Sequence, residues 1–423
     1  MNKSVFFLLF ISVCLFAEST LPLGMDMSLS QPAVADINGD GKKELIIGTV
    51  GGKVWIYDSK TLSGIQVEHW PAQLEDEFGA PPQVITNPNG SLSIGLLGMK
   101  GKFYVLDSKG AQLGEYDTGC LNGSYLATGD YNNDLKLDFA FGTPQGKVYK
   151  LTDTASVQGL LLVESMVSTN VMSFDWDEDG QKETIVKGDD GVLHIFKNNL
   201  EDKKFIPEGL PTGKSMGLMS IRDTNNDMKP SLVYEVIDNS QRVNILKVST
   251  DKNFEVCARL SLKLKSNLLY EDFDGDGKTD LLFVDKEDQV HLLLGMKTEA
   301  SGYPKYVTNI QELSGMLEAA DINNDGRLEV LFASNHVEKE DMTGSLNAFS
   351  PLTGDNCSDF PREVGYNNGQ LLVNDINGDG LLEVVITGMG DAASCGMPNL
   401  KLVKTVGRLP LKTIILAREF TFQ

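Results

Sequence analysis

A nine-residue acidic motif recurs along this chain, and it constrains the fold more than any other feature of the sequence. The motif has Asp at position 1, Asp or Asn at position 3, Asp at position 5, usually Gly at position 6 and usually Asp or Glu at position 9. From the second copy onward the copies start about 45 to 54 residues apart, a period that is typical of stacked supersecondary units. The seven copies begin at Asp36, Asp130, Asp175, Asp223, Asp272, Asp321 and Asp375.

The spacing of the acids within each copy predicts a calcium site. Carboxylates this close together repel one another unless a cation lies among them. Oxygen ligands in this number suit Ca²⁺, which accepts six to eight oxygens, whereas Mg²⁺ prefers a rigid octahedron and retains its waters. Gly at position 6 permits a positive-φ bend. The motif is not an EF-hand, because position 12 is Phe283 in the Asp272 copy and an apolar strand pattern follows where a helix would be needed.

Six copies supply the predicted ligands, and we expect about five to seven Ca²⁺ ions in all. Side chains at positions 1, 3, 5 and 9 and the backbone carbonyl at position 7 form each set. The sets are Asp36, Asn38, Asp40, Lys42 and Glu44; Asp130, Asn132, Asp134, Lys136 and Asp138; Asp175, Asp177, Asp179, Gln181 and Glu183; Asp272, Asp274, Asp276, Lys278 and Asp280; Asp321, Asn323, Asp325, Arg327 and Glu329; and Asp375, Asn377, Asp379, Leu381 and Glu383.

Two copies depart from the pattern. Leu135 replaces Gly at position 6 of the Asp130 copy, where a strained turn costs on the order of 1 kcal/mol, so we expect weaker binding there. The Asp223 copy has Met228 at position 6 and Ser231 at position 9, and it is left outside the ligand sets. For any copy the alternative is a turn held by its own Asx hydrogen bonds without an ion.

The residues around the motif predict strands. A short strand enters each copy, an apolar strand leaves it, and a Gly- or Asp-rich turn leads to an alternating third strand and a more polar fourth. The gap between the first two copies is about twice the others, and Ser91–Asp107 within it parallels Glu44–Asp58 without a preceding acidic motif. We therefore predict an all-β propeller of eight four-stranded blades, with seven blades as the alternative.

The pattern D-x-[DN]-x-D-G-x-x-[DE], followed by an apolar strand, Gly and an aromatic strand, resembles the FG-GAP/VCBS repeats. These repeats form the N-terminal propeller of integrin α-subunits and the propellers of many secreted proteins. The resemblance covers nearly all of residues 30–420. It implies Ca²⁺ in the hairpin between the first two strands of a blade and partners on the opposite face of the ring.

Residues 1–17 are predicted to be a signal peptide, with Lys3 before an apolar Val5–Phe16 and a small residue, Ala17, at the cleavage site. Residues 18–423 then form one exported propeller domain, secreted or periplasmic, with surface association left open. No other apolar stretch is long enough to cross a membrane, so no insertion is expected. The formal net charge of −22 argues against nucleic acid as a partner.

Four cysteines follow residue 17, namely Cys120, Cys257, Cys357 and Cys395. Free thiols and one bridge late in the chain are both compatible with their spacing.

No catalytic motif is present, and the acids recur in equivalent turns, which favours metal ligation over acid–base catalysis. We expect a protein that is not an enzyme; the alternative is a carbohydrate-active propeller, either a lectin or a polysaccharide lyase.

Three long connections interrupt the regular repeat, His69–Pro82, Asn335–Gly344 and Met389–Asn399. The first and last units are neighbours in a closed ring, so we expect these connections on one face, where long loops often carry binding sites. They predict a monomeric module that binds a protein or glycan, as in adhesion, although ordinary variation in loop length is the alternative. The candidate patch comprises His69, Trp70, Glu75, Asp76, His336, Glu338, Glu340 and Asp391.

Overall fold

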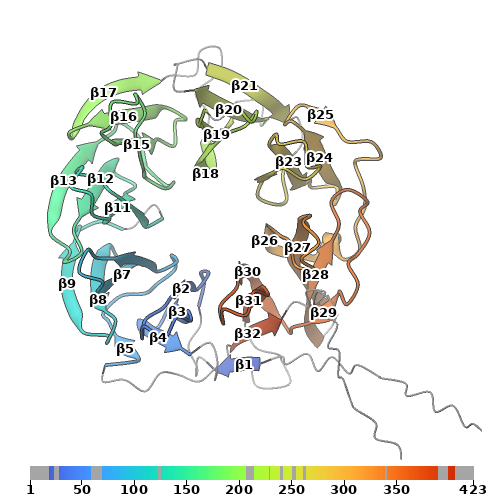
Figure 1. Cartoon of the computed structure of the whole chain (residues 1–423), viewed down its shortest axis with the longest axis horizontal. Coiled ribbons are helices and arrows are strands. Elements are labelled where there is room, and N and C mark those ends of the chain that lie inside the picture. Colours follow the sequence, from blue (N-terminus) through green and yellow to red (C-terminus); the bar gives the residue numbers. More distant parts are fainter. Residues whose placement is uncertain are drawn as a thin grey trace, which may run out of the picture.

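The protein is a ring of eight four-stranded antiparallel sheets, seen face-on in Figure 1. The computed structural model describes residues 19–22, 28–58, 69–121, 125–205, 214–227, 229–238, 242–249, 254–260, 263–338, 341–388 and 399–404. The predicted all-β propeller with four-stranded blades is therefore confirmed, and the eight sheets agree with the eight predicted units.

The blades are numbered along the chain by the strand that precedes the second, buried strand of each sheet. In blades 1 to 4 the four strands of each sheet are consecutive in sequence. Blade 1 contains β2 (Ala33–Ala35), β3 (Glu44–Gly48), β4 (Lys53–Tyr57) and β5 (Ala72–Gln73); blade 2 contains β6 (Gln83–Thr86), β7 (Leu92–Leu97), β8 (Lys102–Asp107) and β9 (Gln112–Asp117); blade 3 contains β10 (Ala127–Gly129), β11 (Asp138–Gly142), β12 (Lys147–Leu151) and β13 (Val157–Leu162); blade 4 contains β14 (Met172–Phe174), β15 (Glu183–Lys187), β16 (Leu193–Lys197) and β17 (Leu200–Phe205).

The next three blades repeat this order, with a short 3-10 helix between blades 6 and 7. Blade 5 contains β18 (Lys214–Arg222), β19 (Ser231–Ile237), β20 (Val243–Ser249) and β21 (Phe254–Leu260); blade 6 contains β22 (Leu269–Glu271), β23 (Asp280–Val284), β24 (Val290–Leu294) and β25 (Thr298–Glu299); the helix is η1 (Ile310–Glu312); blade 7 contains β26 (Leu313–Ala320), β27 (Glu329–Glu338), β28 (Asp341–Phe349) and β29 (Arg362–Glu363).

Blade 8 combines both ends of the propeller. It contains β30 (Asn367–Asn374), β31 (Glu383–Gly388) and β32 (Asn399–Lys404), and its outermost strand is β1 (Ser19–Pro22). Residues Ser19 to Pro22 pair antiparallel with Leu402 to Asn399. The sequence pattern did not reveal this strand, because four residues show no periodicity and the repeat unit assigns its fourth strand to the end of the chain.

The core is divided among the junctions between blades. Eight apolar clusters each combine side chains of two neighbouring sheets, so that every junction around the ring has one. The junction between blades 8 and 1, for example, packs Leu45 and Ile47 of β3 against Val385 of β31. The second strand of a blade is covered on both faces, which explains why β3, β11, β15 and β23 are buried at every residue.

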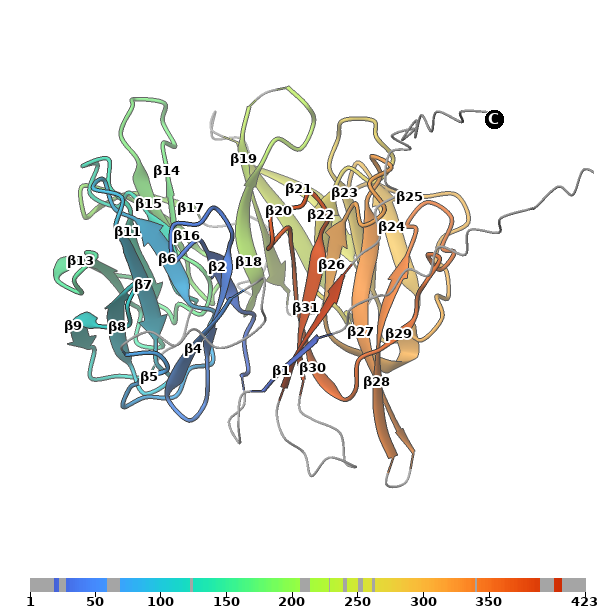
Figure 2. The same cartoon turned by 60° about the horizontal axis from the view of Figure 1, so that its bottom comes forward.

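The strand directions give the ring two different rims. The acidic motifs join first to second strands at one rim, and the turns between second and third strands lie at the other. Figure 2 shows the β14–β15 and β22–β23 connections at the upper rim and the hairpin of β27 and β28 extending beyond the lower rim.

The long connection predicted at Asn335–Gly344 is thus largely a continuation of two strands. Their pairing runs from Val330 opposite Phe349 out to Glu338 opposite Asp341.

Within the described part of the chain, no helix is long and apolar enough to cross a membrane.

Candidate metal centres

The seven acidic motifs lie at one rim as tight loops between the first and second strands, and each is named here after its blade: loops 1, 3, 4, 5, 6, 7 and 8. Position 6 adopts a left-handed backbone in loop 6, where Gly277 has a φ of 83°. Leu135 of loop 3 is forced into the same region with a φ of 66°. The predicted strained turn at Leu135 is therefore present.

Position 4 also adopts a left-handed conformation, a requirement that the sequence reading missed. Gly39 and Gly275 occupy it in loops 1 and 6, and Asn324 occupies it in loop 7 with a φ of 58°. Gly and Asn are the residues that tolerate this region best, so their presence at position 4 was the available signal.

The position-1 aspartate organises the turn. In loop 6, Asp272 Oδ1 accepts the N–H groups of Gly275 at 2.8 Å and Asp276 at 3.1 Å, and its Oδ2 accepts the N–H of Gly277 at 2.8 Å. Asp36 in loop 1 and Asp375 in loop 8 make the same three bonds. The Asx hydrogen bonds expected of a self-supporting turn are therefore present.

The position-9 carboxylate closes the loop from the second strand. In loop 7, Glu329 Oε2 accepts the N–H of Ile322 at 3.1 Å, and its Oε1 accepts the side-chain amide of Asn323 at 2.8 Å. Loops 1 and 8 repeat both contacts with their own Glu and Asn. Positions 3 and 9, six residues apart in sequence, are thus brought into direct contact.

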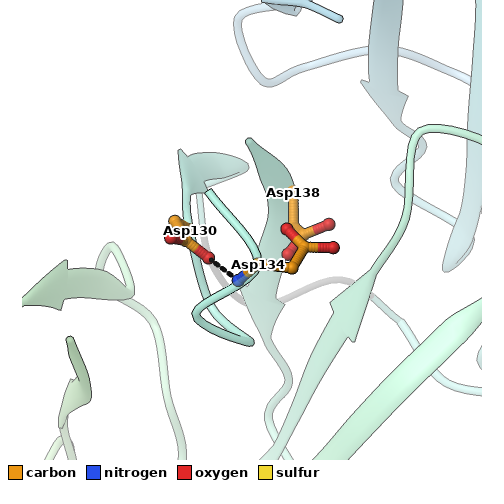
Figure 3. Close-up of side chains that lie close together, drawn as sticks. All are labelled: Asp130, Asp134 and Asp138. Atoms are coloured by element: carbon orange, nitrogen blue, oxygen red, sulfur yellow. Dashed lines mark hydrogen bonds between the residues drawn. The ribbon is translucent and has the colours of Figure 1, made fainter. Parts of the chain in front are cut away.

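Three loops bring three carboxylates together closely enough to hold a metal ion. In each, one oxygen per residue lies within 4.8 Å of the others. Figure 3 shows the cluster of loop 3, where the N–H of Asp134 donates to Asp130 Oδ1 over 3.2 Å and the Asp138 side chain points toward the same space. The three clusters are Asp130, Asp134 and Asp138; Asp175, Asp177 and Glu183; and Asp272, Asp274 and Asp276.

One predicted ligand of loop 6 is directed elsewhere. Asp280 Oδ2 accepts the N–H of Phe273 at 3.0 Å, and its Oδ1 accepts the N–H of Gly295 at 2.8 Å. The close cluster of this loop consists of positions 1, 3 and 5. Backbone donors thus hold both carboxylate oxygens of Asp280, whereas Asp138, the aspartate at position 9 of loop 3, joins the close cluster of its loop.

Burial makes the position-9 carboxylates costly to ionise. It raises the pKa of Asp138 to about 6 and that of Glu329 to about 7, with neighbouring loop aspartates adding to the rise. The pKa values of Glu44, Glu183 and Asp280 are raised for the same leading reason. A divalent cation beside these groups would favour their ionised forms.

The donor set fits a hard cation. Among the described residues, Asp138 Oδ2 and Asn323 Oδ1 are buried oxygens without a hydrogen-bond partner, and both belong to predicted ligand positions. With oxygen as the only donor element at these positions, Ca²⁺ is a better match than Zn²⁺ or Cu²⁺.

Hydrogen bonds connect loops of neighbouring blades. The N–H of Lys43 in loop 1 donates to the carbonyl of Ile376 in loop 8 at 3.0 Å. Between loops 3 and 4, Asn133 accepts the N–H of Lys182 at 2.6 Å and donates to its carbonyl at 3.1 Å. An ion that orders one loop would therefore also restrain its neighbour.

The candidate binding patch is not one surface. Trp70 is buried, and its Nε1 donates to the carbonyl of Ser108 in the β8–β9 turn, which lies at the rim of the acidic loops. The connection after β5 instead reaches the opposite rim, where the N–H of Phe78 donates to Thr49 of the β3–β4 turn. The expectation of one shared face is wrong for Trp70, because the connection runs the full height of the blade. Glu340 and Asp391 lie outside the described residues.

Asp76 also has a structural role. It is 3% exposed, and its carboxylate accepts the N–H groups of Glu77 at 2.7 Å, Lys100 at 3.0 Å and Lys102 at 3.3 Å. The side chain thus ties the connection leaving blade 1 to the β7–β8 turn of blade 2.

Asp76→Ala should lower the free energy of unfolding by about 3 kcal/mol, since three partly buried backbone N–H groups lose the carboxylate that accepts from them. Urea denaturation in saturating Ca²⁺ measures this. The matched control is Glu75→Ala: the Glu75 side chain is 88% exposed and pairs with Lys102 at 3.5 Å, so a change within about 0.5 kcal/mol is expected. Equal effects of the two substitutions would contradict a structural role for Asp76.

The cysteines and histidines give no catalytic constellation. Cys120, Cys257 and Cys357 are free thiols, while Cys395 lies outside the described residues. The four histidines belong to four different blades. His194 and His291 are buried in third strands and contact Glu201 and Glu299, His336 contacts Glu312 at 2.6 Å, and His69 is exposed.

A buried ionisable cluster between blades 4, 5 and 6 was missed by the sequence reading. Lys187 is fully buried, burial lowers its pKa to about 8, and the charge of Glu235 in the next blade partly offsets that lowering. The hydroxyl of Tyr270 in blade 6 donates to Glu235 Oε1 over 3.0 Å. Each of the three occurs once in an otherwise apolar strand pattern, which was the signal available.

Comparison with known proteins supports a repeat propeller. Residues 272–332, which contain loops 6 and 7, match the family described as FG-GAP-like repeat. A search of curated protein sequences finds no match to this chain.

Among solved structures, the chain is similar to the Vibrio cholerae biofilm matrix protein Bap1, with a TM-score of 0.58, 13% identity and coverage of 90% of this chain and 88% of that one. It is also similar to Saccharomyces cerevisiae Sqt1, with a TM-score of 0.59, 11% identity and coverage of 92% and 98%. BamB from Moraxella catarrhalis gives a TM-score of 0.52, 12% identity and coverage of 91% and 98%. At these identities the likeness shows the fold alone.

Proposed function

The chain is a β-propeller of the FG-GAP repeat type, and on that premise we propose that it is an exported, calcium-stabilised module that binds a protein or a glycan. In this proposal the acidic loops are structural and the opposite rim carries the binding surface. The protein acts as a monomeric propeller outside the cytoplasm and is not an enzyme.

The convergence of carboxylates in repeated loops is the single observation that carries the calcium role. Three loops hold oxygens of three acids within 4.8 Å, and the loops recur at equivalent places of the ring. Backbone N–H groups hold these carboxylates in place and offset only part of their mutual repulsion. An ion at each loop would therefore stabilise the hairpin between the first two strands, and its binding free energy would add to the stability of the fold.

The binding role is supported by the extension of β27 and β28. Four residue pairs, from Asn335 opposite Gly344 to Glu338 opposite Asp341, continue the hairpin beyond the length of the five-residue second strands of blades 1, 3, 4 and 6. Val337 in this extension is 59% exposed. The extension projects from the rim opposite the acidic loops, so that a partner could bind there without displacing an ion (Figure 2).

The direct test is capture of partners from the extracellular fraction with and without Ca²⁺, beside a glycan array and an assay for lyase activity on uronate polymers. We expect a Ca²⁺-dependent protein or glycan partner and no cleavage. Cleavage of a polysaccharide by the purified protein would overturn the assignment as a binding module.

Shortening the hairpin should separate binding from folding. Replacing residues 336–343 with Asn-Gly leaves Asn335 opposite Gly344 and closes the strands with a favoured two-residue turn. We expect at least a tenfold loss of affinity for the captured partner, with a melting temperature within about 2 °C of wild type because few core contacts change. Surface plasmon resonance and calorimetry measure the two quantities.

A single-residue pair provides the control. Val337→Ser should weaken binding, whereas Val157→Ser, at a 43% exposed valine on β13, should not. Unchanged affinity in the shortened variant would place the partner elsewhere on the ring.

A further inference from the structure

Loop 4 contains a cation of its own, the ammonium group of Lys197. This residue ends β16, the third strand of blade 4, and its side chain reaches over the loop. Its Nζ lies 3.2 Å from Asp177 Oδ2 and 3.7 Å from Glu183 Oε1, and it also donates to Asp179 Oδ2. One ammonium group thus contacts the carboxylates at positions 3, 5 and 9.

The ammonium group of Lys197 contacts a buried carboxylate of the loop as well as two partly exposed ones. The Glu183 side chain is 2% exposed, and the Asp177 and Asp179 side chains are 30% and 39% exposed. The ammonium therefore lies beside the oxygens that a divalent ion would need. Asp179 stands outside the close cluster of Asp175, Asp177 and Glu183, but its carboxylate also contacts Lys197.

The strand register distinguishes blade 4 from blades 1, 3, 6 and 7. Lys197 follows the pair Thr184–Phe196, which places it across from Glu183 at position 9. At the corresponding place other blades have uncharged or acidic residues: Asp58 in blade 1, Thr152 in blade 3, Leu294 in blade 6 and Ser350 in blade 7. Blade 8 has Lys404 opposite Glu383, but its side chain is outside the described part.

A lysine ammonium is a compact charge with three donors on a flexible stem. At loop 4 it offsets part of the repulsion among the carboxylates without any ion from solution. Ca²⁺ can take up the same oxygens only after the ammonium withdraws, so the two cations compete. Within the described residues of loop 6, Lys278 contacts one carboxylate oxygen, Asp276 Oδ2, at 2.6 Å, so it competes for fewer of the oxygens.

We propose that Lys197 is a tethered cation that competes with Ca²⁺ for loop 4. The competition, which rests on the proposed calcium role, makes loop 4 a weaker site than loops 1, 6 and 7, and it keeps blade 4 ordered when those loops lose their ions. The order of loop 4 therefore depends on the protein's own lysine rather than on the calcium concentration.

Trp176 allows loop 4 to be observed by itself. It is a buried residue at position 2 of the loop, and its backbone N–H donates to Glu183 Oε2 at 2.7 Å. The chain has three tryptophans, so the substitutions Trp55→Phe and Trp70→Phe, both in blade 1, leave Trp176 as the local fluorescent reporter. Ca²⁺ is titrated in chelator-buffered solution while this fluorescence and the total bound Ca²⁺ are recorded.

Lys197→Met should shift the Trp176 transition to at least tenfold lower Ca²⁺ and leave loops 1, 6 and 7 unchanged. Lys204→Met is the matched control in the same blade, since that ammonium contacts Glu164 at 2.8 Å rather than loop 4, and it should not move the Trp176 transition. Ser350→Lys tests the reverse: Ser350 lines a cavity of about 250 Å³ together with Asn323, Asp325 and Glu329, so a lysine there has room to reach loop 7 and should weaken its site.

Thermal unfolding in EDTA supplies a second measurement that does not require any bound ion. Lys197→Met and Lys197→Gln should both melt below wild type in EDTA, and the difference should vanish in saturating Ca²⁺. If no variant binds Ca²⁺ but both substitutions lower the melting temperature in EDTA, the calcium role fails while the tethered cation stands. An unmoved Trp176 transition in a protein that does bind Ca²⁺, or equal melting of all variants in EDTA, overturns the proposal for Lys197.

Discussion

Excess EDTA should lower the melting temperature of the purified protein by more than about 10 °C. When free Ca²⁺ is at a hundredfold excess over the dissociation constant of a site, that site contributes about 2.7 kcal/mol to stability. The five loops with both Gly at position 6 and an acid at position 9, namely loops 1, 4, 6, 7 and 8, together contribute about 13 kcal/mol. With an unfolding entropy of about 2.1 cal/mol/K per residue over a chain of 423 residues, this corresponds to a shift of about 15 °C.

Differential scanning calorimetry with elemental analysis of bound metal measures this effect. Adding back Ca²⁺ should restore the transition, whereas the same concentration of Mg²⁺ should restore little of it, because a flexible carboxylate loop does not impose the rigid octahedron that Mg²⁺ requires. An unchanged transition in EDTA, together with no bound ion before treatment, would leave the loops as Asx turns that need no metal.

Deleting Ser19–Pro22 should lower the melting temperature by at least about 5 °C. Strand β1 pairs with β32 over four residues, and each backbone hydrogen bond that is lost costs about 0.5–1.5 kcal/mol. The deletion also exposes the edge of β32 and leaves the two ends of the ring joined only through the junction between blades 8 and 1.

Limited proteolysis followed by mass spectrometry should then show the first cleavages within blade 8. The control keeps the strand but removes side chains: Ser19→Ala with Thr20→Ala preserves the backbone pairing, so its melting temperature should remain within about 2 °C of wild type. A deletion variant that melts with wild type would show that β1 contributes nothing to ring closure.

The repeat made most of the fold predictable. Position 1 and position 9 of each motif fixed where the first strand ends and the second begins, and the structure starts β23 at Asp280 and β31 at Glu383, both at position 9. The unit without acids was also found correctly, since β7 and β8 fall within Ser91–Asp107. Local patterns sufficed because blades 1 to 7 pair only strands that are close in sequence.

What escaped prediction depends on contacts between distant residues. Strand β1 pairs with residues about 380 positions away, and no local pattern reports such a partner. Trp70 and Asp76 looked like surface residues in a polar connection, yet their partners are in the turns of blade 2, which the sequence could not place beside them. The reach of Lys197 over loop 4 likewise depends on the register between β15 and β16.

The pairing of β1 with β32 has a consequence for the order in which the molecule matures. The strand that closes the ring is made before every other strand, and its partner is made after all of them. During synthesis β1 therefore has no partner strand while the sheets between it and β32 form. A chain that ends before β32 lacks the pairing that completes blade 8, so its ring stays open at that blade.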